Sequence, residues 1–174
     1  MVGGWVLKNS VITIIVILTL SIVALSGCIN TVGTGVLLLQ ITDAPSNLNI
    51  TKALVHISNI EVHLIGTGWC TVVEEPQLFD LIELKDVKKV LGNVTLSTGR
   101  YTQIRLHIDD AIVTIDGIEH NLKISSDKIQ LISPFSINEN ETTTLTIDFD
   151  VQSSVFSTGS NKYMMKPTIK VIQE

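Results

Sequence analysis

The sequence is poor in cysteine and, beyond Cys28, in alanine, and both scarcities narrow the structural class. Only two of the 174 residues are cysteines, Cys28 and Cys70, which excludes a scaffold held by several disulfides. Beyond Cys28, alanine occurs at three positions only, whereas a helical domain uses this strong helix former far more often. Isoleucine, valine and threonine are abundant there instead, and such β-branched residues favour strands. The composition therefore predicts an all-β domain.

The chain has one long apolar run, and it is short for a membrane span. Val11 to Leu25 carries no charged residue and follows Lys8, the only basic residue before Cys28. As a helix at about 1.5 Å per residue, this run covers roughly 22 Å, less than the ~30 Å hydrocarbon core of a bilayer. The pattern is typical of a signal peptide. The alternative is an N-terminal hydrophobic helix retained as a signal anchor from Val11 to Ile29.

The residues that end this run, Leu25-Ser26-Gly27-Cys28, resemble the prokaryotic lipobox. In a lipobox, small residues precede a cysteine that is linked to diacylglycerol and becomes the new N-terminus. The resemblance implies a signal peptide at residues 1–27, a lipidated cysteine and tether at 28–35, and a domain at 36–174. Processing and a signal anchor both place that domain on the outer face of the cell membrane, with membrane lipid as the first partner.

Positive charge is also scarce. Without Lys8, eleven basic residues face seventeen acidic ones, a formal charge of −6 for the processed chain. Nucleic acid is therefore not expected as a partner, because phosphate binding requires a concentrated basic face. The processed chain keeps 147 residues, the usual size of one domain with a real core.

Alternating polarity marks half-buried strands, since successive side chains of a strand point to opposite faces. The apolar positions are Ile104, Leu106 and Ile108 in one segment and Leu145, Ile147 and Phe149 in another. Val36 to Ile41 is almost wholly apolar, which predicts a central strand covered on both faces. A change of apolar parity between Val55 and Leu64 predicts a β-bulge near Ser58-Asn59.

Turn residues separate these strands. Asp116-Gly117 predicts a two-residue hairpin turn, because both residues tolerate positive φ. The one helix we expect runs from Lys85 to Leu91, with Gly92 as its C-cap. Pro167 lies inside the last strand pattern, Tyr163 to Ile172, and predicts an edge position or a bulge. Together the segments predict an antiparallel β-sandwich of about seven to nine strands.

Several segments together resemble the prokaryotic lipoprotein family catalogued as domain of unknown function 4382. They are Leu39-Gln40-Ile41-Thr42-Asp43-Ala44-Pro45, Gly68-Trp69, Gly99 to Leu106, Asp148-Phe149-Asp150 and Lys166-Pro167. The Gly99-x-Tyr101 step is also similar to a strand entry in transthyretin-like and carboxypeptidase-regulatory-like sandwiches. The resemblance implies a lipid-anchored sandwich and brings no known substrate, cofactor or catalytic residue.

Three acidic residues are candidate metal ligands. Asp148 and Asp150 are two apart on one predicted strand, and Asp43 in a Thr-Asp-Ala-Pro turn adds a third carboxylate. Calcium takes six to eight oxygens, so such a site needs further donors from loops. The simpler interpretation is that Asp148 and Asp150 face solvent or pair with Lys166 or Lys170.

The polar face that contains Arg105 and His107 is the best-defined candidate binding surface, for an anion or a sugar, although such a stripe is more often a solvated strand face.

The sequons at Asn49, Asn93 and Asn140 permit glycosylation. Recognised zinc, nucleophile-elbow, P-loop and dinucleotide motifs are missing from the sequence, which disfavours an enzyme. We therefore expect a non-catalytic module that binds a protein, a glycan or an envelope component, with a calcium-stabilised module as the alternative and an unrecognised envelope enzyme as a lesser one.

Overall fold

The computed structural model describes residues 33–43, 49–159 and 162–174. The chain divides into two compact units, Met1–Thr31 and Val32–Glu174, and every described residue belongs to the second. The predicted leader and Cys28 lie outside the described residues. In the part of the chain that the structure describes, no helix is long and apolar enough to cross a membrane.

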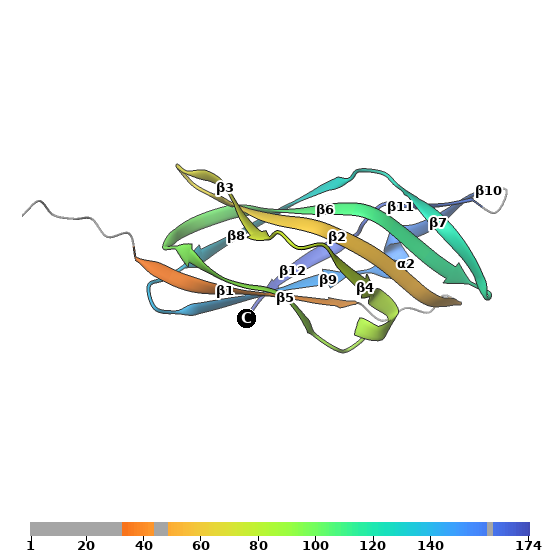
Figure 1. Cartoon of the computed structure of the whole chain (residues 1–174), viewed down its shortest axis with the longest axis horizontal. Helices are drawn as coiled ribbons and strands as arrows, with labels where there is room; N and C mark the ends of the chain where they lie inside the picture. Colours follow the sequence, from red (N-terminus) through yellow and green to blue (C-terminus); the bar gives the residue numbers. More distant parts are fainter. Residues whose placement is uncertain (1–32, 44–48, 160–161) are drawn as a thin grey trace, which may run out of the picture. The chain divides into compact units, whose positions relative to one another are not determined.

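Strands make up most of this unit, which confirms the all-β class and the sandwich (Figure 1). One sheet has the order β12-β9-β1-β5 and the other has the order β10-β11-β7-β6-β2-β3, with β4 also paired to β2 and β8 to β6. The strands are β1 (Thr34–Asp43), β2 (Ile50–Leu64), β3 (Gly68–Val73), β4 (Gln77–Asp80), β5 (Lys89–Ser97), β6 (Gly99–Ile115), β7 (Ile118–Ile124), β8 (Lys128–Ile137), β9 (Thr142–Phe149), β10 (Val155–Gly159), β11 (Lys162–Met165) and β12 (Ile169–Gln173). Two short helices join them, the 3₁₀ helix η1 (Leu81–Leu84) and α2 (Val151–Ser154).

Alternate side chains from the two sheets form one core. The apolar positions predicted in β6 and β9 are fully buried, which confirms both strand faces. In β1, Leu37, Leu39 and Ile41 are fully buried while the residues between them are half-buried. At one end of the core the rings of Tyr101 and Phe135 stack with centroids 5.0 Å apart, and burial of the Tyr101 ring raises the pKa of its hydroxyl.

The sheets are mixed, whereas the sequence predicts purely antiparallel ones. β1 runs parallel to β9, and β7 runs parallel to β11. The described residues contain twelve strands, more than the seven to nine predicted. One cause is Lys166-Pro167-Thr168, which divides the predicted last strand into β11 and β12. These two strands belong to different sheets, so Pro167 lies where the chain crosses from one sheet to the other rather than in a strand.

The predicted helix from Lys85 to Leu91 is wrong. A 3₁₀ turn, η1, comes earlier and is capped by Asp80, whose carboxylate accepts a hydrogen bond from the Ile82 amide. Asp86 has a φ of 59°, a left-handed conformation that is incompatible with a continuing helix. The chain then enters β5, where Gly92 pairs with Leu39 of β1. Helix propensity in this segment is overridden by pairing with a buried neighbour.

Close packing around the Cα atom explains two glycines better than helix capping or tether flexibility. A Cβ on Gly92 would lie 2.9 Å from a methyl carbon of Val73, so a larger residue there would require the stiff Val73 side chain to shift. Gly35, predicted to end a tether, is already part of β1, and a Cβ there would lie 2.2 Å from the Asn138 carbonyl oxygen. The first strand therefore begins at Thr34 rather than at Val36.

The predicted turn and bulge are confirmed. Asp116 and Gly117 have φ angles of 50° and 80° and join β6 to β7 in a two-residue hairpin. The β2–β6 register shifts between His56 and Asn59, close to the predicted position. Because the bulge changes the parity of β2, residues on both sides of it direct apolar side chains to the same core.

Candidate functional site

Arg105 and His107, the predicted binding residues, lie on the outer face of the larger sheet and meet at one carboxylate. Arg105 is directly opposite Glu61 of β2 in the register. Its Nη1 donates to Glu61 Oε2 at 3.2 Å, and His107 Nε2 lies 3.0 Å from the same oxygen. Glu61 therefore joins two side chains of β6 that are separated by one residue.

A tryptophan completes this group. The Arg105 guanidinium carbon lies 3.7 Å from the ring centroid of Trp69 on β3, a close cation–π contact. His63 packs edge-on against the same indole at 5.1 Å, and its Nδ1 lies 3.2 Å from the Thr102 hydroxyl. We call Glu61, His63, Trp69, Arg105 and His107 the outer-face cluster. Its members come from three adjacent strands, so their spacing is set by the sheet.

The electrostatics of the outer-face cluster are set at Glu61. Partial burial raises the pKa of the Glu61 carboxyl. Hydrogen bonds from His107 and Arg105, together with the positive charge of these partners, lower this pKa by more, so it lies below its ordinary value. About a quarter of the Arg105 and His107 side chains is exposed, and about a fifth of that of Glu61. The cluster is thus preformed and still reachable from solvent.

Beyond the cluster, one apolar side chain is exposed at the edge of the same face. In the row that contains His63, the register continues through Gln103 of β6 to Ile132 of β8. Ile132 is 82% exposed, more than the other exposed large apolar residues that the structure describes. Gln103 also accepts a hydrogen bond from Gln130 of β8, which ties the edge strand to the centre of the face.

The three acidic residues proposed for calcium do not point to one place. Asp43 is 4% exposed and its Oδ1 accepts a hydrogen bond from the Val151 amide at 3.1 Å. Asp150 lies beyond the end of β9 and caps α2, accepting from the Ser153 amide and hydroxyl, each at 2.8 Å. Because Asp43 pairs with Phe149 and Asp148 with Thr42, alternation directs the Asp43 and Asp148 side chains to opposite faces.

Asp148 and its neighbours also do not form a cluster of metal ligands among the described residues. Asp148 lies opposite Lys170 of β12, the neighbour expected on sequence grounds, and its Oδ1 is buried without a hydrogen-bond partner. Within residues 33–43, 49–159 and 162–174, no group of three or more histidine, cysteine or acidic side chains is placed to hold a metal ion. Asp43 and Asp150 act as acceptors for backbone amides at the start of α2.

The predicted sequons all lie on the surface. Asn49, Asn93 and Asn140 are exposed, in a turn, in β5 and in the β8–β9 connection respectively. Asn140 has a φ of 60°, and Asn49 donates to the Asp116 carboxylate. Their exposure is compatible with glycosylation, which stays a prediction.

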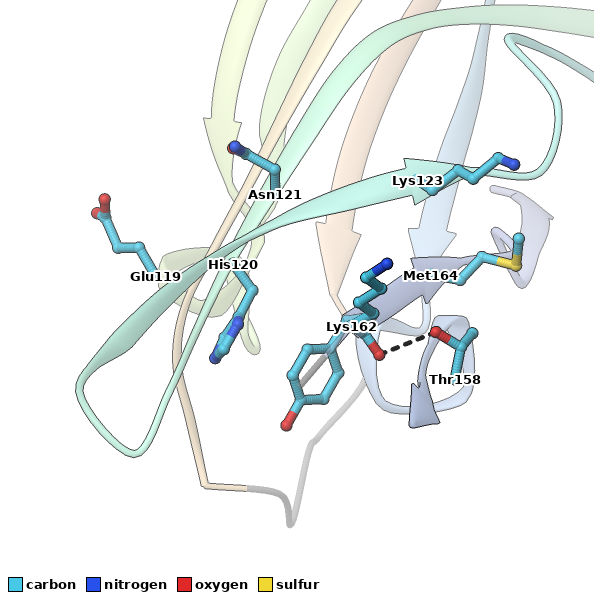
Figure 2. Close-up of a pocket in the computed structure, with 8 residues that line it drawn as sticks. Glu119, His120, Asn121, Lys123, Thr158, Lys162 and Met164 are labelled. Atoms are coloured by element: carbon cyan, nitrogen blue, oxygen red, sulfur yellow. Dashed lines mark hydrogen bonds between the residues drawn. The ribbon is translucent and has the colours of Figure 1, made fainter. Parts of the chain in front are cut away.

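A hollow beside β7 and β11 was not predicted from the sequence. It has a volume of about 370 Å³ and lies where β7 and β11 diverge (Figure 2). We call it the β7–β11 notch, and its lining consists of Glu119, His120, Asn121, Lys123, Thr158, Lys162, Tyr163 and Met164. The rings of His120 and Tyr163, with centroids 4.6 Å apart, are on the opposite side of the two strands from Asn121, Lys123 and Lys162. The two halves of the notch are some forty residues apart in the chain, and only the parallel β7–β11 pairing brings them together.

A family model described as domain of unknown function (DUF4382) matches residues 34–167. The chain belongs to this family. The match runs from the first residue of β1 to Pro167, so it includes the outer-face cluster and the β7–β11 notch, and β12 lies beyond it. No curated protein and no solved structure matches the chain. The DUF4382 resemblance noted in the sequence is thereby confirmed, and the transthyretin-like one stays a prediction.

Replacement of Glu61 tests the outer-face cluster through its pH dependence. The lowered pKa means that the stabilisation by ionised Glu61 is complete above the ordinary glutamate pKa and is lost as the pH falls through the lowered value. We expect Glu61→Gln to reduce the free energy of unfolding by about 1 kcal/mol at pH 7. The difference from the parent should be smaller at pH 3 than at pH 7. Urea denaturation at both pH values measures it.

Glu75→Gln is the matched control, because Glu75 is exposed on the loop between β3 and β4. It should leave the stability at pH 7 unchanged. An equal loss for Glu61→Gln at pH 7 and pH 3 would contradict the assigned role of the Glu61 charge.

Proposed function

We propose that this DUF4382 protein is an exported lipoprotein whose domain is a non-catalytic binding module on the outer face of the cell membrane. The anchor is Cys28, supported by the uncharged run before it and by the small residues at the lipobox. Since β1 begins at Thr34, five residues separate Cys28 from the first strand. A tether of that length keeps the domain close to the bilayer.

The outer-face cluster is the observation that carries the binding role. Trp69 and Arg105 are the residue types that most often dominate the binding energy of protein interfaces. Here their side chains are held in a stack, and Glu61 fixes the guanidinium from the other strand. A preformed group of this kind binds with little loss of side-chain entropy.

The surroundings of the cluster favour a protein partner over a glycan. Ile132, at the edge of the same face, exposes an apolar side chain that a sugar does not require and that a protein partner would cover. The polar residues around it, Gln103 and Gln130, can supply the hydrogen-bonding rim of such an interface. We therefore propose that the module docks an extracytoplasmic protein on this face.

Mass spectrometry of the native protein tests the anchor. We expect a chain that begins at Cys28 and carries diacylglycerol on its sulfur. A Cys28→Ala variant should lose both the lipid and the cleavage at residue 27. An unmodified chain that starts at Met1 in membranes would favour the signal anchor instead, and an unmodified chain in the cytosol would contradict export.

Photo-crosslinking in intact cells tests the docking face. A photoreactive phenylalanine analogue at Ile132 should give one discrete protein adduct, because Ile132 borders the cluster. Trp69→Ala or Arg105→Ala should reduce the adduct about tenfold, the effect of losing one interface hot spot. The matched control carries the analogue at Val87, which is also exposed but precedes β5.

The docking proposal fails if no adduct forms, or if Val87 gives the same adduct. It also fails if Trp69→Ala leaves the yield unchanged in a protein with native circular dichroism. An adduct whose mass is removed by glycosidase and not by protease would assign the face to a glycan.

A further inference from the structure

We propose that the docked protein contributes an extended segment that pairs with β8 as an added strand and fills a groove between β8 and β12. This inference rests on the proposed docking function and names the way in which the partner binds. The groove has a volume of about 540 Å³ and is lined by residues 130–133 of β8 and 169–171 of β12. We call it the β8–β12 groove.

The two walls of the groove are edge strands of different sheets (Figure 1). Among the described strands, β8 pairs only with β6, and β12 pairs only with β9. Each of them therefore has one side without a neighbouring strand. The backbone groups on such an open side are able to pair with an extended chain.

The hydrogen-bonding pattern identifies the free backbone groups of β8. In an antiparallel pair, every second residue directs its N–H and C=O towards the partner strand, and the residues between direct theirs away. The Ile108 amide of β6 donates to the Asp127 carbonyl oxygen at 2.9 Å. Because the β6–β8 register is continuous over residues 128–132, Leu131 is in phase with Asp127 and faces β6. The backbone of Gln130 therefore faces the groove.

Lys128, which has the same phase as Gln130, supports this assignment. Its amide donates to the Ser126 hydroxyl oxygen at 3.3 Å, and its carbonyl oxygen accepts from that hydroxyl at 2.8 Å. A local side chain thus occupies the outward groups of Lys128. The outward N–H and C=O of Gln130 have no such partner among the described residues. An added strand would satisfy both groups.

The opposite wall has free backbone groups as well. The Glu174 amide donates to the Thr144 carbonyl oxygen at 3.1 Å, so the residues of β12 that share its phase face β9. Ile169 and Val171 have the other phase and direct their backbone groups to the open side. Both residues line the groove. The groove therefore runs between two rows of backbone donors and acceptors.

The side chains beside the groove indicate what kind of segment fits. Leu131, Ile169 and Val171 are half-buried and pack against the core. Ile132 follows Leu131 in β8 and points to the outer face, where it is 82% exposed. A strand added to β8 would alternate in the same way, with one set of side chains over Leu131 and Val171 and the other beside Ile132. Such a strand continues the docking face.

Backbone hydrogen exchange, measured by nuclear magnetic resonance on the full chain in detergent micelles, tests the free edge. The Leu131 amide faces β6 and the Gln130 amide faces the groove. We expect the Gln130 amide to exchange roughly a hundredfold faster than the Leu131 amide. Equal protection of the two amides would show that the edge of β8 is already paired, which would overturn the proposal.

A proline variant tests strand addition in intact cells. Gln130→Pro removes the N–H that faces the groove and leaves the bonds from β8 to β6, because proline is tolerated in edge strands. With the photoreactive analogue at Ile132, this variant should reduce the protein adduct about tenfold. Gln130→Ala is the matched control, because it removes the same side chain and keeps the N–H, and it should leave the adduct unchanged.

The outcomes separate this inference from the docking proposal. An adduct that forms equally well with Gln130→Pro overturns strand addition and leaves the docking face in place. No adduct in the parent chain is the failure of the docking proposal, and strand addition fails with it. An adduct between two copies of the chain, or a crosslink within one chain, would assign the groove to another occupant and overturn the partner segment.

A last measurement does not need the proline variant to fold. In the purified adduct formed at Ile132, the Gln130 amide should exchange about tenfold more slowly than in the free chain, because the added strand accepts its hydrogen bond. The Leu131 amide should exchange at the same rate in both. Unchanged exchange at Gln130 in the adduct would overturn strand addition.

Discussion

The antiparallel pairing of β2 with β6 is the constraint on which the rest of the domain depends. It places Glu61 opposite Arg105 and His63 opposite Gln103, and the pairing of β2 with β3 then adds Trp69 to the outer-face cluster. A slip of one residue would turn the polar set inward and Ile104 and Leu106 outward, so burial of the core fixes the register. The core and the outer face are therefore two consequences of one pairing.

The same pairing separates the outer-face cluster from the β7–β11 notch. The outer-face cluster occupies the first half of β6, whereas the hairpin that leads to the β7–β11 notch leaves its far end.

Local patterns predicted the parts of the fold that local forces decide. The alternation in β6, the Asp116-Gly117 turn and the bulge near Ser58 each follow from a few neighbouring residues. The polar stripe was located for the same reason, but Glu61 and Trp69 were missed as its partners because they come from other strands. The helix at Lys85 failed because a buried partner strand outweighs helix propensity. The notch depends on a parallel pairing formed after the chain passes between sheets, which no local pattern encodes.

The most direct test is a measurement of the β2–β6 register by nuclear magnetic resonance on the isotopically labelled chain. Cross-strand nuclear Overhauser effects should connect the backbone protons of Glu61 with those of Arg105, and those of Val62 with those of Ile104. Contacts that instead place Glu61 opposite Ile104 or Leu106 would contradict the pairing and, with it, both the outer-face cluster and the core described above.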